Sequence, residues 1–160
     1  MLDKDLRVLL VDDSPPIRFV MPMRLGQCLG IPKDAVKIHF ALSGQEALGL
    51  MKTNAYDLIL TDTQMPKMDG AGLIHAIRSD EQWQHIPVIL ISGNQLSDRG
   101  MAETLKKLAG LKVTFDAFCW KNNLVNGLKP AIEQAFASRT AVLQQQAPMA
   151  EPEGLQTLSL

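Results

Sequence analysis

Residues 8–18 read VLLVDDSPPIR, and this stretch decides the fold. The run Val8 to Val11 is apolar without alternation, which is typical of a strand buried on both faces of a parallel sheet. The pair Asp12-Asp13 ends the run. A Ser-Pro dipeptide then opens a helix, because proline is tolerated at the first helical position. The stretch therefore predicts a strand, an acidic turn and the start of a helix.

The same unit repeats along the chain. Continuous apolar runs at 58–60 and 88–91 predict two more buried strands. At 36–40, valine, isoleucine and phenylalanine alternate with lysine and histidine, which predicts a strand near the sheet edge. The β-branched and aromatic residues of 113–120 predict a fifth strand. Five such βα units make a doubly wound parallel sheet with helices on both faces, and the expected strand order is 2-1-3-4-5.

Helical periodicity fills the segments between the strands. In the first helix, Pro22 lies inside the apolar stripe, which predicts a kink or a late start. A second helix opens with the capping box that begins at Ser43. The third helix carries the apolar residues Leu73, Ile74 and Ile77.

The last two helices carry breakers. The fourth helix is expected to open at Ser97 or Asp98 and to end at Gly110 as a left-handed cap, with an inward stripe of Met101, Leu105 and Leu108. In the fifth helix, Pro130 would remove a hydrogen bond from the interior, so this helix is expected to begin near Asn126 or later.

Composition places the chain among soluble globular proteins. It has 160 residues, 46% of them apolar and 21% charged, with a formal net charge of -1. Because basic residues do not cluster, we expect no nucleic-acid partner. The N-terminal residues resemble neither a signal peptide nor a membrane span, so we expect a cytoplasmic protein without a membrane partner. Cys28 and Cys119 have no metal-site spacing and are expected to be free thiols.

A change in composition after Ala137 divides the chain. Residues 1–137 are expected to form one domain, and residues 138–160, which are rich in Gln, Pro and Glu, to form a disordered tail. This tail has too few basic residues for a DNA-binding module. Its leucines leave docking on a partner open as an alternative.

Polar residues collect where the predicted strands end: Asp12 and Asp13, Asp62, Ser92 and Lys121. In an open parallel sheet, ligands bind beyond the carboxyl ends of the strands. Carboxylates that close together repel one another unless a cation neutralises them, so the cluster predicts a hard divalent ion, with Mg²⁺ favoured.

Each of these residues also has a structural interpretation. An acidic residue of the first pair can complement a helix N-terminus. Asp62 and Ser92 can be turn residues, and Lys121 can be a solvated surface amine. Four successive strand ends with this chemistry are harder to explain in that way.

Three segments resemble the receiver domains of two-component response regulators, especially the stand-alone, CheY-like chemotaxis type, with a flavodoxin-like fold. They are VLLVDDSPPIR (8–18), LILTDTQMPKMDG (58–70) and IPVILISG (86–93). The resemblance runs from about Leu6 to Phe136, and its second segment is the most specific. The combination is a stronger signal than any single short motif.

The resemblance implies an acidic phosphorylation site. Asp62 would accept a phosphoryl group from a phosphohistidine on a sensor histidine kinase or a histidine phosphotransfer protein. Asp13 and Asp62 would ligate Mg²⁺, Asp12 would do so directly or through water, and the backbone carbonyl of Gln64 would complete the protein ligands. Mg²⁺ and a lysine together supply the charge neutralisation that phosphoryl transfer needs.

The resemblance also implies a switch toward a downstream protein target. Lys121 would pair with a phosphoryl oxygen, and Ser92 would follow the phosphoryl group by hydrogen bonding. Phe118 matches the aromatic position whose rotamer reports the active state, and the alternative is that it is a packed aromatic. Phosphorylation would then bias an existing two-state equilibrium.

One departure from the family pattern affects the choice among functions. Asn122 stands where the family usually has proline after the lysine, so the loop geometry is expected to differ. The leading hypothesis is a single-domain response regulator that is not an enzyme. The alternative is a degenerate receiver that acts as an unphosphorylated scaffold. A Mg²⁺-dependent phosphohydrolase is a third hypothesis, disfavoured because the acidic pair lacks DxD spacing.

Overall fold

The computed structural model describes residues 5–93 and 99–146. Strands and helices alternate along the chain in the βα pattern expected from the sequence. Their bounds are β1 (Leu6–Val11), α1 (Pro15–Leu29), β2 (Val36–Ala41), α2 (Gly44–Met51), β3 (Leu58–Asp62), α3 (Gly70–Ser79), β4 (Val88–Ser92), α4 (Arg99–Leu111), β5 (Ala117–Trp120) and α5 (Leu124–Gln146). Short 3-10 turns at Lys33–Ala35 and Lys121–Asn123 precede β2 and α5.

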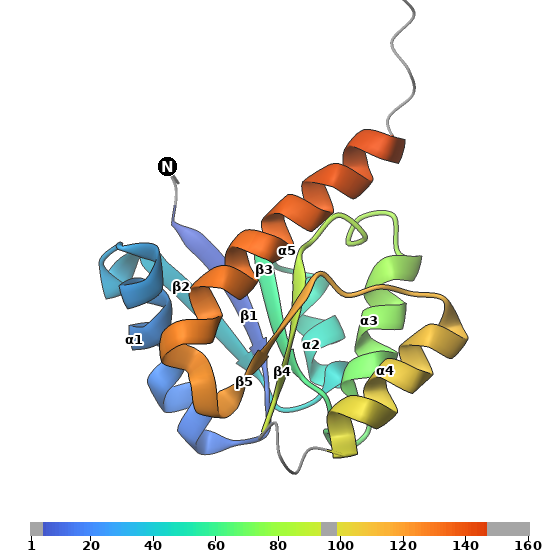
Figure 1. The fold of residues 1–160 in the computed structure, drawn as a ribbon, viewed down its shortest axis with the longest axis horizontal. Coiled ribbons are helices and arrows are strands. Elements are labelled where there is room, and N and C mark those ends of the chain that lie inside the picture. Colours follow the sequence, from blue (N-terminus) through green and yellow to red (C-terminus); the bar gives the residue numbers. More distant parts are fainter. Residues whose placement is uncertain (1–4, 94–98, 147–160) are drawn as a thin grey trace, which may run out of the picture.

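The strands form one parallel sheet in the order β2-β1-β3-β4-β5, which confirms the predicted fold class and order. Helices α1 and α5 cover one face, and α2, α3 and α4 cover the other (Figure 1). The alternating strand at 36–40 is β2, at the sheet edge, as its exposed lysine and histidine indicated. The fifth strand is shorter than expected and begins at Ala117.

Strand residues alternate between two apolar cores. On β3, Leu58 and Leu60 pack beneath α1 and α5, whereas Ile59 packs beneath α2, α3 and α4. On β4, Ile89 and Ile91 belong to the first core. Because side chains alternate along a strand, each residue that ends a strand is aimed toward a known face of the sheet.

Two helices run through a proline. Helix α1 begins at Pro15 and continues through Pro22, so the late start expected there is wrong. Helix α5 begins at Leu124, two residues before Asn126 and so close to the expected start, and it contains Pro130. Both helices bury an apolar stripe against the sheet, and that burial outweighs the hydrogen bond that each proline removes.

The helix α5 also runs past the expected domain boundary. It continues to Gln146, so residues 138–146 are helical, and the expectation that they start a disordered tail is wrong. Arg139 in this segment is 6% exposed, and its Nε donates to Asp116 Oδ1 at 3.1 Å. The remainder of the predicted tail, 147–160, lies outside the described residues.

The fourth helix differs in detail from the sequence expectation. Met101 and Leu108 are buried, but Leu105 is 41% exposed, and Thr104 occupies the buried position beside it. The helix passes through the glycine expected to end it, and the left-handed residue is Lys112, at φ 56°. The expected start at 97–98 lies outside the described residues.

Two minor expectations concern cysteines and membranes. Cys28 and Cys119 are free thiols, half-buried and buried respectively, and burial raises the pKa of Cys119 to about 11. Among the described helices, none combines the length and the apolar character needed to cross a bilayer.

Candidate phosphorylation site

The carboxyl ends of three strands bring the acidic residues and the lysine together. Asp12 follows β1, Asp62 ends β3 and Lys121 follows β5. In the alternation of their strands, all three share the face of the sheet that α1 and α5 cover. The predicted convergence is confirmed for the carboxylates and the lysine, whereas Ser92, which was predicted to join them, faces the other side of the sheet.

The three carboxylates are close enough to share one cation. One carboxylate oxygen from each of Asp12, Asp13 and Asp62 lies within 4.8 Å of the others. Asp12 is fully buried and Asp62 is 8% exposed, whereas Asp13 is exposed. Asp12 also accepts a hydrogen bond at 2.7 Å from the backbone N–H of Ser14, so it supports the entry to α1 as well.

Lys121 is the cation of this cluster rather than a free surface amine. Its Nζ lies 2.8 Å from Asp12 Oδ2 and 3.1 Å from Asp62 Oδ2, and its side chain is 17% exposed. Burial lowers the pKa of this ammonium, but the bond to Asp12 and the charge of Asp62 outweigh burial and raise the pKa overall. Lys121 therefore stays charged.

The pKa of Asp62 is raised from its ordinary value. Burial is the main cause, and the charge of Asp12 adds to it, while Lys121 and the backbone N–H of Thr63 act in the opposite direction. The fold therefore disfavours the ionised form of the Asp62 carboxylate. Such perturbed groups are concentrated at functional sites.

The donor set fits a hard divalent cation. Three carboxylates and one ammonium leave two negative charges uncompensated among these four side chains. Asp12 Oδ2 is buried and, apart from the ion pair with Lys121, has no hydrogen-bond donor of good geometry among the described residues. Oxygen ligands with excess negative charge are what Mg²⁺ requires.

The close approach of two backbones after Asp62 explains why Gly70 ends the sequence Met68-Asp69-Gly70. A Cβ at Gly70 would collide with the backbone carbonyl oxygen of Asp62, so only glycine lets α3 begin here. Asp69 caps α3 by accepting from the N–H of Gly72 at 2.8 Å. Strand β3 and helix α3 are thus packed backbone to backbone.

Ser92 ends β4, as predicted, and its hydroxyl lies beside that of Thr63, a residue that the sequence analysis missed. Its hydroxyl lies 3.1 Å from Thr63 Oγ1, and both side chains are buried. Strand alternation was the signal available in the sequence, because it places Ser92 and Thr63 on the face opposite to Asp62.

Gln64 and Phe118 lie at the border of the site. The side chain of Gln64 is exposed, and its Nε2 donates to Glu103 Oε2 of α4 at 3.2 Å. Phe118 is 51% exposed on β5 and makes an edge-to-face contact with Trp120 at 5.8 Å between ring centroids. Phe118 is therefore an exposed aromatic and not a packed core residue.

The altered loop after Lys121 has an ordinary backbone. Its bond to Asn122 is trans, as are the peptide bonds elsewhere in residues 5–93 and 99–146. A 3-10 turn from Lys121 to Asn123 leads directly into α5. The absence of proline is accommodated here without moving Lys121 away from the acidic cluster.

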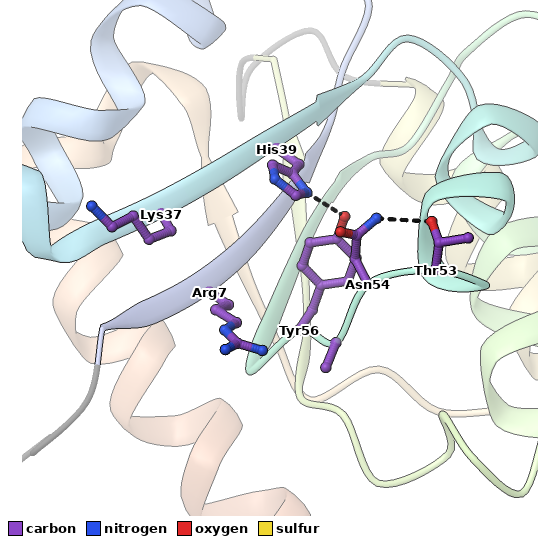
Figure 2. A pocket seen from close by; sticks show the side chains of 7 residues that line it. Arg7, Lys37, His39, Thr53, Asn54 and Tyr56 are labelled. Atoms are coloured by element: carbon purple, nitrogen blue, oxygen red, sulfur yellow. Dashed lines mark hydrogen bonds between the residues drawn. The ribbon is translucent and has the colours of Figure 1, made fainter.

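Apart from the acidic cluster, a hollow of about 350 Å³ lies at the edge of the sheet and is lined by basic and polar residues of β1, β2 and the loop before β3. His39 Nδ1 and the Tyr56 hydroxyl point toward each other at 2.7 Å, while the ammonium end of Lys37 points away from them (Figure 2). Lys37 Nζ donates to the carbonyl of Asp34 at 2.7 Å. Because these charged groups do not converge, the acidic cluster is the stronger candidate site.

Comparison with known proteins places the chain in a family. Residues 8–111 match the response regulator receiver domain. The chain is 39% identical over 132 residues to the gliding motility regulatory protein of Myxococcus xanthus, covering 82% of this chain and 15% of that protein. It is 34% identical over 92 residues to chemotaxis protein CheY-3 of Vibrio cholerae, covering 58% of this chain and 67% of that protein.

Solved structures agree on the fold. A CheY-like receiver domain protein from Methanospirillum hungatei superposes with a TM-score of 0.64 at 19% identity, covering 86% of this chain and 98% of that chain. Three of the curated relatives are much longer, since the chain spans 15%, 39% and 8% of their lengths. The chain belongs to the response regulator receiver domain family and is a CheY-like domain of two-component signalling.

Proposed function

We propose that the chain is a single-domain response regulator in which phosphorylation of Asp62 switches a protein-binding surface. The observation that carries this proposal is the junction of Asp62, Asp12 and Lys121, with the ammonium 2.8 and 3.1 Å from the two carboxylates. A carboxylate nucleophile needs a cation to accept the charge of the incoming phosphoryl group. Lys121 is that cation in the chain itself.

The chemical step is a displacement at phosphorus. A carboxylate oxygen of Asp62 forms the new P–O bond, and the P–N bond of the donor phosphohistidine breaks, leaving the electron pair on the imidazole, which takes up a proton. Lys121 is placed to pair with a phosphoryl oxygen. Phosphoryl transfer depends mainly on such positioning and charge stabilisation.

Asp12, Asp13, Asp62 and the backbone carbonyl of Gln64 are the residues that would hold Mg²⁺ at this site. When bound, the ion supplies positive charge that offsets the excess of carboxylates and the charge of the phosphoryl oxygens. Asp13 is the exposed member of the set, so it is open to a cation from solvent. Asp62 and Asp12 are buried, and Asp12 lies deepest, at 0% exposure.

Ser92 and Phe118 would carry the switch. The Ser92 hydroxyl would donate to a phosphoryl oxygen, and the exposed ring of Phe118 would change its packing against Trp120. The output would be a contact with another protein rather than turnover of an external substrate. Its partners would be a sensor histidine kinase or a histidine phosphotransfer protein upstream and a protein target downstream.

Intact mass spectrometry after incubation with Mg²⁺ and acetyl phosphate tests this proposal. We expect one phosphoryl adduct on the native chain, none without Mg²⁺, and none on Asp62→Asn. Asp34→Asn, which removes an exposed carboxylate outside the site, is the matched control and should form the adduct. An adduct on Asp62→Asn would contradict the assignment.

The second candidate function is an unphosphorylated scaffold. The observation that favours it is Asn122, which replaces the usual proline directly after the lysine of the site. Failure of the native chain to form an adduct, together with failure to bind Mg²⁺ in calorimetry, would replace the switch with the scaffold.

A further inference from the structure

The hydroxyls of Ser92 and Thr63 form a buried pair next to the acidic cluster. Their oxygens are 3.1 Å apart, and the two residues are 1% and 2% exposed. Buried hydroxyls keep hydrogen-bond partners because an unsatisfied one is costly. This pair therefore contributes to fixing where the Ser92 hydroxyl points.

The register of the sheet shows on which side that hydroxyl lies. Asp62 pairs with Ile91 across β3 and β4, so the next position along both strands places Thr63 opposite Ser92. Ile91 belongs to the core beneath α1 and α5. By alternation, Asp62 is on that face, while Ser92 and Thr63 are on the face of α3 and α4.

The backbone around Thr63 holds that residue firmly. The N–H of Thr63 donates to Asp62 Oδ1 at 2.7 Å, and its carbonyl accepts from the N–H of Gly70 at 3.0 Å. Ser92 is the last residue of β4 and is followed by the exposed Gly93. Thr63 is thus held in place by its own backbone, and its hydroxyl is fixed beside that of Ser92.

We propose that Thr63 is a positioning residue that holds the Ser92 hydroxyl on the α3 and α4 face in the unphosphorylated chain, and so opposes its movement toward a phosphoryl group on Asp62. This inference rests on the proposed function. To reach a phosphoryl oxygen on Asp62, the Ser92 hydroxyl must turn away from the α3 and α4 face, and this movement breaks the bond to Thr63 whichever hydroxyl donates in it. The strength of that bond then sets part of the free energy of the switch.

Removing the Thr63 hydroxyl should favour the switched state. A buried hydrogen bond of this kind corresponds to a change of about 2- to 10-fold in an equilibrium constant. Thr63→Val keeps the shape of the side chain and removes the bond, and Thr63→Ser keeps the hydroxyl. Ser92→Ala removes the group on which Thr63 is proposed to act.

Affinity for beryllium fluoride in the presence of Mg²⁺, measured by calorimetry, gives an equilibrium readout, because this complex mimics a phosphoryl group. We expect Thr63→Val to tighten binding by about 2- to 10-fold and Thr63→Ser to bind like the native chain. In a Ser92→Ala background, Thr63→Val should change nothing, which a merely structural role of Thr63 would not predict.

The outcomes separate the two proposals. Equal tightening by Thr63→Val with and without Ser92, or no tightening at all, would overturn the role of Thr63 while leaving the proposed function in place. If the native chain neither binds beryllium fluoride nor forms the acetyl phosphate adduct, both proposals fall.

Discussion

At the scale of single residues, the site opposes the ionisation of its own central group. Burial and the charge of Asp12 raise the pKa of Asp62, and Lys121 offsets only part of that effect. An ionised Asp62 therefore costs folding free energy at neutral pH. A cation bound to this carboxylate, or a phosphoryl group bonded to it, would reduce that cost of ionisation.

The first prediction is that Asp62→Asn stabilises the chain at neutral pH. Because the pKa of Asp62 in the native state lies above that in the unfolded state, the cost of ionisation is fully present above the raised pKa and is relieved as the pH falls through it. We expect a gain of about 1 kcal/mol, or about 2–4 °C in Tm, that shrinks toward acid pH. Calorimetric melting across pH checks this, in Mg²⁺-free buffer.

Asp34→Asn removes an exposed carboxylate outside the site and is the control for that prediction. Its melting temperature should follow that of the native chain at every pH. A gain for Asp62→Asn that grows toward acid pH would show that the sign of the pKa shift is wrong.

At the scale of elements, apolar packing overrides local helix breakers. Helix α5 carries Pro130 in its interior, where the missing N–H leaves a carbonyl one turn earlier without its helical partner. The helix nevertheless begins at Leu124, because Leu128 and Ile132 are buried against the sheet. The sequence predicted all five helices. It placed this start near Asn126, two residues beyond Leu124, because the effect of the proline was considered without the burial of the apolar stripe.

Pro130→Ala should stabilise the chain. Pro130 is exposed, so the substitution loses no packing, and it restores an N–H inside a helix. We expect a gain of about 1–3 kcal/mol in the free energy of unfolding, measured by urea denaturation. The control is Pro32→Ala, at an exposed proline outside the helices, which should bring no gain. Equal gains for the two variants would contradict this account of α5.

Predictability differed between strands and helix ends. The strands themselves and the edge position of β2 followed from apolar runs and alternation, which are properties of the burial that each strand requires. The end of α4 did not, because Lys112 rather than a glycine adopts the left-handed conformation. Local rules favour glycine at such a position without requiring it.

At the scale of the whole molecule, a buried ion cluster ties the extended helix α5 to the end of the sheet opposite the acidic cluster of Asp12, Asp13 and Asp62. Asp116 lies between Arg78 Nη2 of α3 at 2.6 Å and Arg139 Nε of α5 at 3.1 Å, and its carboxylate also accepts from the N–H of Val88. Burial, with the charge of Arg139, lowers the pKa of Arg78 to about 10, against the opposing effect of Asp116. This cluster fixes α5 beyond the boundary expected at Ala137.

Asp116→Asn should therefore destabilise the whole domain. It leaves two arginines buried without their counter-ion, which typically costs about 3–5 kcal/mol. Lys107→Ala is the matched control, because it breaks an ion pair with Asp69 whose side chains are 57% and 29% exposed, and the loss of such an exposed pair should change stability far less. Urea denaturation of both variants is the measurement. Equal losses would show that the buried cluster does not anchor α5.

The sequence predicted the acidic site more completely than it predicted this cluster. Asp12, Asp13, Asp62 and Lys121 stand at strand ends, and parallel strands carry their ends to one edge by topology alone. Thr63 and Arg139 were missed for different reasons. The role of Thr63 depends on register between strands, and that of Arg139 depends on a helix whose length the polar composition of 138–146 concealed.

The central claim is that Asp62 itself carries the phosphoryl group, and borohydride trapping tests it most directly. The chain is incubated with acetyl phosphate and Mg²⁺, and borohydride then reduces the acyl phosphate to an alcohol, which converts that aspartate to homoserine. Peptide mass spectrometry reads the position. We expect homoserine at position 62 alone and only when Mg²⁺ is present. Homoserine at Asp12, at Asp13 or at any other carboxylate would contradict the claim, and so would homoserine at no position.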